Sequence, residues 1–406
     1  MSQLPISLLY FSNEPIRGGA EEHLLTLIRG LDRTRFRPLL VCPFELAEKL
    51  HPDLPQDVEV FPLCLRRLSQ FDAMLRLARI LRDRQVKILH SHLFFASLLA
   101  SPIGWACGVP VIVETPHVRE HWRSGWLKSR FVVDRFVGHF VTHYIAVSEA
   151  NKRYLVEQKH LPSEKITVIL NGSDLRRFRP EEHVASNLRQ NLGFGSDDPV
   201  LMVVGRLEPQ KGHRILLGAL PAIRREFPSA RLVCLGEGSL HAELLNQTRE
   251  LGIEDAVRFI GFQNNVAEWL SLADFTVLPS FYEGLPLVAI ESLAAGRPVV
   301  ATAVDGSGEV VVNGKTGLTV PPGDSAALSA AICRLLGDGS LRERMGREGR
   351  EWVCTHFDER EQVRRTQELY FRAWEQTAHV VEKPAEMARE ETKEPSVGTT
   401  VAGGRP

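Results

Sequence analysis

The chain of 406 residues lacks several features that would assign it to a specialised protein class. Its six cysteines are scattered, with no C-x-x-C pair, so a reduced setting explains them better than disulfides or a zinc site. No uncharged apolar run approaches the ~20 residues of a membrane-spanning helix, and the first residues, MSQLPI, show no basic leader region. We therefore expect a cytoplasmic globular protein.

Charge is nearly balanced over the whole chain, with a net value of −1, but it is uneven between the halves. Residues 1–180 carry 25 Lys/Arg against 18 Asp/Glu, and the remainder carries 24 against 32. A basic amino-terminal half suits an anionic lipid surface or a phosphate-bearing acceptor, although an uneven scatter of charges explains it equally well. The stretches Arg66–Lys87 and Trp122–Phe131 would suit a membrane surface, or a solvated helix face and a buried aromatic cluster.

Two α/β units follow one another along the chain, as expected for a length that suits two domains. Short apolar segments separated by helical stretches are typical of parallel strands covered on both faces. The first unit has candidate strands at Ile6–Phe11, Pro38–Cys42, Val86–His90, Val109–Val113, His143–Val147 and Ile166–Leu170. The second has candidates at Val200–Val204, Ala230–Leu235, Val257–Ile260, Phe275–Leu278 and Pro298–Ala301.

The polar stretch Arg176–Pro199 separates the two units and places a domain boundary near residue 180. We expect domains at 1–180 and 181–375, the second ending in a long amphipathic helix at Glu359–Trp374. The residues 382–406 contain few aliphatic and no aromatic side chains, and we expect them to be disordered.

The segment 280–302 is the most informative part of the sequence. After a strand at Val277-Leu278, it reads as a turn that holds Glu283, a short helix that holds Glu291, and a second strand at Pro298–Ala301. The helix opens on Gly284-Leu285, so its free N–H groups and positive dipole end face whatever lies at the strand's carboxyl edge. Two carboxylates beside such a helix start favour a ligand with both hydroxyls and phosphates. A nucleotide sugar fits that description.

Three further loops follow candidate strands. Gly18 and Gly19, after the first strand, allow close backbone approach to a ligand or simply form a turn; the loop is not G-x-G-x-x-G, so a dinucleotide fingerprint is unsupported. Arg206 and Lys211 follow Val204 and would bind phosphate, or else be solvated loop charges. His117 follows Val113, and a lone histidine is more often structural.

Together these segments resemble the family 4 retaining glycosyltransferases (glycosyl transferases group 1), over roughly residues 4–375. The motifs that carry the resemblance are Glu-x7-Glu, G-R-x-x-x-x-K-G, Gly-Gly-Ala-Glu and Asn-Gly-Ser-Asp. The resemblance implies an α/β fold of GT-B architecture, with two Rossmann-like, doubly wound parallel-sheet domains facing across a cleft. Residues 1–180 would then be the acceptor side and 181–375 the nucleotide-sugar-binding domain, whose terminal helix crosses back to the first.

The resemblance also implies roles for individual residues. Glu291 would bind the ribose hydroxyls, Glu283 would lie near the donor sugar and pyrophosphate, and His117 would touch the sugar near the reaction centre. His117 and Glu283 are therefore the catalytic candidates. The donor-binding set that the family implies is Gly18, Gly19, Arg206, Lys211, Glu283, Gly284, Leu285, Leu287 and Glu291.

One segment departs from the family pattern. Asp305-Gly-Ser-Gly-Glu309 matches Gly-Gly-x-Pro-Glu, but with Asp305 where Gly is usual and Gly308 where Pro is usual, which leaves the local turn geometry open. Asn171, in the Asn-Gly-Ser-Asp segment, is expected to be structural. No Asp-x-Asp that would chelate a metal–nucleotide complex occurs, and Arg206 and Lys211 can neutralise a pyrophosphate, so we expect neither a metal nor a cofactor.

We therefore expect a retaining glycosyltransferase that uses a nucleotide sugar, UDP-linked rather than GDP-linked. Its acceptor would be a glycan, a lipid-linked molecule or a small molecule, with peripheral contact to an anionic membrane and no nucleic acid partner. The alternative is a non-catalytic nucleotide-sugar sensor or partner subunit on the same fold. A nicotinamide-dependent oxidoreductase lacks its glycine fingerprint. Glycoside hydrolysis needs two carboxyls ~5–9.5 Å apart around one sugar. It is rejected because Glu283 lies before a helix and Glu291 within it, so that they would serve neighbouring parts of one ligand.

Overall fold

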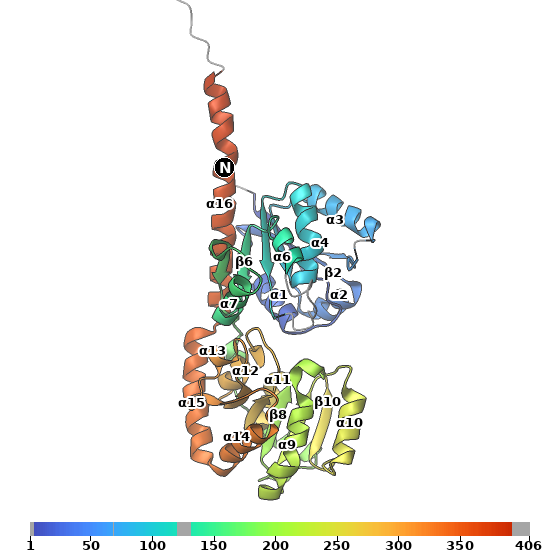
Figure 1. Cartoon of the computed structure of the whole chain (residues 1–406), viewed down its shortest axis with the longest axis vertical. Helices are drawn as coiled ribbons and strands as arrows, with labels where there is room; N and C mark the ends of the chain where they lie inside the picture. The colour runs from blue at the N-terminus through green and yellow to red at the C-terminus, as the bar shows by residue number, and fades with distance from the viewer. Residues whose placement is uncertain (1–3, 68, 120–130, 392–406) are drawn as a thin grey trace, which may run out of the picture.

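Two parallel β-sheets, one in each half of the chain, form the framework of this protein (Figure 1). The computed structural model describes residues 4–67, 69–119 and 131–391. The first sheet has the strand order β3-β2-β1-β4-β5-β6-β7 and the second β10-β9-β8-β11-β12-β13. In both sheets the order reverses beside the first strand, as in Rossmann-like domains, and such a reversal opens a crevice at the carboxyl ends of the strands. The expected GT-B arrangement of two α/β domains is confirmed.

The strands agree with the predicted segments, apart from two that the sequence analysis missed. The first sheet contains β1 (Ile6–Phe11), β2 (Phe36–Cys42), β3 (Glu59–Pro62), β4 (Ile88–His92), β5 (Val111–Thr115), β6 (His143–Ala146) and β7 (Ile166–Val168). The second contains β8 (Val200–Val204), β9 (Arg231–Leu235), β10 (Val257–Gly261), β11 (Phe275–Leu278), β12 (Val299–Thr302) and β13 (Gly317–Val320). The missed strands, β3 and β13, lie at sheet edges, and each has a sequence (EVFP and GLTV) with only two large aliphatic or aromatic side chains, which gives no clear apolar run.

Helices cover both faces of each sheet. Those of the first half are α1 (Gly19–Gly30), α2 (Phe44–Leu50), α3 (Phe71–Asp83), α4 (Phe94–Ala106), α6 (Val132–Val137) and α7 (Glu149–Glu157). Those that follow are α8 (Glu182–Asn191), α9 (His213–Glu226), α10 (His241–Glu250), α11 (Val266–Leu272), α12 (Leu287–Ala294), α13 (Ser307–Val310), α14 (Ser325–Gly337), α15 (Gly339–His356) and α16 (Glu359–Glu391). Along β1, Leu9 and Phe11 belong to one core cluster and Leu8 and Tyr10 to another. Alternate residues of a strand point to opposite faces, so the sheet is buried on both sides.

The last helix, α16, returns to the amino-terminal domain as expected. Tyr370 is fully buried there and its hydroxyl lies 2.5 Å from Nδ1 of His90, while Val363 packs against Gly30. The expectation that residues 382–406 are disordered stays a prediction; in the structure, residues 382–391 continue α16 beyond the amino-terminal domain (Figure 1). Glu, Lys, Ala, Met and Arg dominate this stretch, and these residues favour a helix even without an apolar face. Residues 392–406 lie outside the described part of the chain.

The division of the chain near residue 180 stays a prediction, although β7 ends at Val168 and β8 begins at Val200. Within the described residues, no helix is both long and apolar enough to cross a membrane.

Candidate active site

Loops from the two domains meet at the carboxyl ends of the two sheets. A β-carbon added to Gly284, in the second domain, would lie 1.7 Å from the carbonyl oxygen of His117, in the first. One added to Gly19 would lie 3.9 Å from Cδ1 of Leu287. Gly284 thus has no room for a side chain, and its backbone touches the loop that carries His117. The structure brings the predicted residues of both halves to one place.

Glu283 is held from three directions. Its side chain is buried, and Oε1 accepts hydrogen bonds from Nζ of Lys211 at 2.6 Å and from Oγ of Ser280 at 2.7 Å. Its backbone N–H donates to Oδ2 of Asp305 at 3.1 Å. Lys211 is four-fifths buried and packs its aliphatic stem near Gly205, whereas Arg206 is exposed to solvent. One cation of the predicted pair is therefore fixed by a carboxylate, and the other is free to reach a ligand.

The start of α12 offers backbone donors, as predicted. Pro286 stands at the N-cap position without a side-chain cap, and the described residues form no hydrogen bond to the N–H groups of Gly284, Leu285 or Leu287. The helix N-terminus also carries the positive end of the helix dipole. This geometry suits an anionic or hydroxyl oxygen placed beside Glu283.

Glu291 lies inside α12, one turn behind those donors. Burial raises the pKa of its carboxyl to about 7, the nearby Glu22 carboxylate adds to the rise, and Arg177 opposes it. No hydrogen bond to its carboxylate occurs within the described residues. A carboxylate in this state gains from a partner that donates hydrogen bonds, such as a pair of hydroxyls.

Glu21 is a residue of the candidate site that the sequence analysis did not single out. Its side chain is buried, Oε2 accepts the N–H of Gly18 at 3.0 Å, and Oε1 has no partner. Burial is the main reason that the pKa of Glu21 rises to about 7; Glu14 raises it further, and Arg206 of the other domain lowers it. The signal in the sequence was the Gly-Gly-Ala-Glu segment, because a Glu at the third helical position reaches back to the N-cap backbone.

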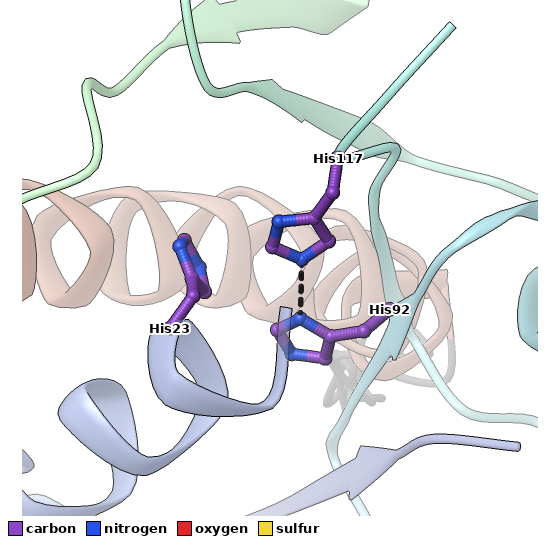
Figure 2. A group of neighbouring side chains, drawn as sticks. All are labelled: His23, His92 and His117. Atoms are coloured by element: carbon purple, nitrogen blue, oxygen red, sulfur yellow. Dashed lines mark hydrogen bonds between the residues drawn. The ribbon is translucent and has the colours of Figure 1, made fainter. Parts of the chain in front are cut away.

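His117 belongs to a buried group of imidazoles, drawn in Figure 2 with His23 and His92. Nε2 of His117 lies 3.0 Å from Nδ1 of His92, and the His23 ring meets the His117 ring edge-on at 4.7 Å between centroids. Nδ1 of His23 lies 2.7 Å from Oδ1 of Asn171. Asn171 therefore acts as a partner of the histidine group as well as a loop residue.

Burial keeps these imidazoles neutral at pH 7. It lowers the pKa of His117 and of His92 well below the ordinary histidine value, and that of His23 to about 4, with neighbouring histidines adding to the effect on His117 and His92. A neutral His117 acts through hydrogen bonds rather than as a cation. The sequence analysis missed His92 although it ends β4, the kind of position from which the other candidates were chosen.

The segment that departs from the family pattern joins the two domains. Asp305 adopts a backbone φ of +39° and forms an ion pair with Arg119 at 2.9 Å. Glu309 accepts the backbone N–H groups of Glu149 at 3.0 Å and Ala150 at 2.9 Å, at the start of α7. A β-carbon on Gly308 would meet nothing within 4 Å, so crowding does not explain why Gly replaces Pro there.

Comparisons with known proteins agree with this geometry. Residues 17–177 match the sequence profile of "Glycosyltransferase Family 4", and residues 184–352 match that of "Glycosyl transferases group 1". A glycogen synthase of Mycobacterium tuberculosis is 33% identical over 317 residues, which are 74% of this chain and 73% of that protein. A D-inositol 3-phosphate glycosyltransferase of Thermobispora bispora is 31% identical over 66% of this chain and 67% of its own.

A solved structure shows the same fold. The crystal structure of Anabaena Alr3699/HepE in complex with UDP and glucose superposes with a TM-score of 0.80. It is 22% identical in sequence and covers 90% of this chain and 99% of its own. At that identity the likeness concerns the arrangement of the two domains.

Proposed function

The chain belongs to the family 4 glycosyltransferases, and from this premise we propose that it transfers a hexosyl or N-acetylhexosaminyl group from a UDP-linked rather than a GDP-linked sugar. The acceptor is a glycan, a lipid-linked molecule or a small molecule. The observation that supports the donor site best is the meeting of Glu283 and Lys211 with the uncapped start of α12. Carboxylate, cation and open N–H groups together match the hydroxyls and the diphosphate of a nucleotide sugar.

The diphosphate, the ribose and the transferred sugar each have a partner in this proposal. The diphosphate binds Arg206, Lys211 and the N–H groups of Gly284, Leu285 and Leu287, with Gly18 and Gly19 close to it on the other wall. The ribose hydroxyls bind Glu291. Lys211 exchanges part of its contact with Glu283 for the diphosphate, which releases Glu283 to act on the sugar.

The reaction retains configuration and uses no metal. The acceptor attacks from the face that the leaving diphosphate occupies, and the diphosphate takes the acceptor's proton, so that the protein supplies mainly position and charge. Arg206 and Lys211 neutralise the charge that develops on the diphosphate, and neutral His117 orients a sugar hydroxyl by a hydrogen bond. Activity should therefore survive treatment with EDTA.

A thermal-shift screen against UDP, GDP, ADP and their sugars tests the donor. The complex of Anabaena HepE with UDP and glucose favours UDP as the first candidate. A ligand at ~100 times its dissociation constant adds ~2.7 kcal/mol of stability, so the correct nucleotide should give a clear rise in Tm. If none of the nucleotides raised Tm, the proposal would be contradicted. Binding of a nucleotide sugar without release of nucleotide in the presence of acceptor extracts would favour the non-catalytic sensor.

Lys211→Ala tests the diphosphate subsite. The variant should weaken the binding of UDP far more than that of uridine, measured by titration calorimetry. If the binding of UDP and of uridine were weakened equally, the assignment of Lys211 to the diphosphate subsite would be wrong.

Peripheral contact with an anionic membrane is part of the proposal. Helix α3 leaves Phe71 at 69% and Leu75 at 65% exposure, on the same helix as the exposed Arg76 and Arg79. Exposed large apolar side chains beside arginines suit the surface of an anionic bilayer. Of the stretch Trp122–Phe131, only Phe131 lies within the described residues, and it is buried, so α3 is the element that supports the contact.

A further inference from the structure

Asp305 stands between the two loops that carry the catalytic candidates. Its side chain is 7% exposed and uses both carboxylate oxygens: Oδ1 pairs with Nη1 of Arg119 at 2.9 Å, and Oδ2 accepts the N–H of Glu283 at 3.1 Å. Arg119 belongs to the amino-terminal domain and Glu283 to the carboxyl-terminal one. One carboxylate therefore binds both walls of the site.

The backbone conformation at Asp305 favours glycine, so an aspartate at this position costs conformational energy. Its φ of +39° lies in the left-handed region, which residues with a β-carbon adopt only at an energetic penalty, although Asp tolerates it better than most. Strained backbone persists where surrounding contacts hold it, and it concentrates at functional sites. Here the surrounding contacts are the two hydrogen bonds of the carboxylate.

Arg119 is placed so that fixing its guanidinium also restrains the loop that carries His117. It follows His117 by two residues in the same loop, and its guanidinium also lies over the ring of Tyr154, 5.0 Å from the ring centroid. A guanidinium fixed by both a carboxylate and an aromatic face has little freedom to move. The carbonyl oxygen of His117, in turn, abuts Gly284, the residue after Glu283.

We propose that Asp305, together with Arg119, is a positioning residue that sets Glu283 relative to His117. The other contacts of Glu283, from Lys211 and Ser280, hold its carboxylate from within its own domain. The contact with Asp305 holds its backbone and ties it to the opposite wall. This inference rests on the proposed function, because it assigns a purpose to the positions of His117 and Glu283.

Asp305 acts through Glu283 rather than on the donor, so its loss should change turnover more than binding. Small displacements of reacting groups lower the rate of a positioned reaction strongly while leaving ground-state contacts in place. With UDP-glucose, UDP-galactose and UDP-N-acetylglucosamine as probes, the donor that gives the largest thermal shift is used to measure release of UDP. Asp305→Gly should lower kcat about tenfold, and the donor KM and the dissociation constant of UDP should change less than about twofold.

Four variants separate positioning from a merely structural role. Asp305→Gly suits the backbone conformation, so its Tm should stay close to that of the wild type or fall only slightly. Asp305→Asn keeps an acceptor for the N–H of Glu283 and should recover part of kcat. Arg119→Gln should lower kcat as well, and the double variant Arg119→Gln/Asp305→Asn should lose less than the product of the single effects, because the two residues act as one unit.

Asp198 offers a matched control. Its carboxylate likewise accepts a backbone N–H, from Gly195 at 2.9 Å, and pairs with an arginine, Arg231 at 2.8 Å, but every partner lies in the second domain. Asp198→Asn should lower Tm and leave kcat unchanged. An unchanged kcat in Asp305→Gly, or a loss that tracks Tm in both variants, would overturn the proposal.

The two hypotheses fail in different ways. If wild-type protein neither binds a nucleotide nor releases UDP from a nucleotide sugar, the proposed function is wrong. If the wild type releases UDP and Asp305→Gly does so at the same rate, the function stands and the role given to Asp305 is wrong.

Discussion

Single carboxyls in the cleft carry much of its electrostatic character. Burial raises the pKa of both Glu21 and Glu291 to about 7, whereas Glu283 is paired with Lys211. Glu21 and Glu291 thus change charge near neutral pH in the protein without ligand, and each lies where a donor or a cation is expected. The candidate site therefore carries more negative charge above neutral pH than below it.

The stability of the protein should depend on pH in part through the Glu21 carboxyl. Its pKa is raised by folding, so its contribution to the free energy of unfolding is complete below its ordinary value of 4.5 and is lost as the pH rises through about 7. Glu21→Gln removes this loss and can still accept the N–H of Gly18. Its Tm, relative to wild type, should therefore rise between pH 5 and pH 8, as measured by circular dichroism. A constant difference over that range would contradict the raised pKa; the buried histidines act equally in both proteins.

The two glutamates of the Glu-x7-Glu segment should differ in kinetics. In the proposed function Glu291 binds the ribose, which does not change during the reaction, so Glu291→Gln should raise KM more than it lowers kcat. The same proposal puts Glu283 beside the transferred sugar, so Glu283→Gln should lower kcat while donor affinity stays close to normal. Steady-state kinetics of UDP release measures both. The opposite pattern in the two variants would reverse the roles.

At the scale of elements, the start of α7 is held by the other domain. Its own N-cap, Ser148, accepts the N–H of Asn151 at 3.0 Å, and Glu309 of α13 accepts the two N–H groups before it. A carboxylate at a helix N-terminus is stabilising, and here it also joins the domains. We therefore expect the Glu309 side chain to contribute to the spacing of the two domains, beside the contacts of Asp305 and Gly284.

Glu309→Ala should loosen this junction. We expect a larger radius of gyration by small-angle X-ray scattering without ligand, and a return to the wild-type value with saturating UDP-sugar. Asp324→Ala is the matched control, since Asp324 caps α14 within one domain through the N–H of Ala327 at 2.8 Å. Both variants should lose about 0.5–2 kcal/mol of stability as caps do, but only Glu309→Ala should expand. Equal scattering from both would exclude Glu309 as a junction.

The strands and loops also show which parts of the fold and of the candidate site could be predicted from the sequence. The long apolar strands and the loops after them were predictable, because period and turn chemistry are local properties, and these loops do converge on one site. Asp305 and Arg119 are 186 residues apart, and only the fold reveals their ion pair. Strand β3 is partly exposed and lacks a run of apolar residues, so its sequence pattern does not indicate a strand. The histidine group was missed because His23 and His92 gain their meaning only beside His117.

At the scale of the whole molecule, the basic amino-terminal half and the exposed residues of α3 favour one membrane-facing side. The protein should co-sediment with vesicles that contain anionic lipid, less so with neutral ones, and the attachment should weaken as salt shortens the screening length. Phe71→Ser with Leu75→Ser should reduce it. Phe262→Ser, an exposed phenylalanine of the second domain, should leave it unchanged. Binding that changes with neither lipid charge nor salt concentration would contradict electrostatic attachment to the membrane.

The return of α16 has a consequence for the order in which the molecule can be made. Val363, Leu369, Tyr370 and Ala373 belong to the same core cluster as Leu8 and Ile88, so the first domain contains residues that the ribosome adds only after the second domain. Until those residues have left the exit tunnel, one face of the first sheet lacks part of its cover, and we expect the nascent chain to carry exposed apolar surface past the completion of the second domain. A premature stop shortly before α16 should thus destabilise the first domain, although that domain is synthesised before the second.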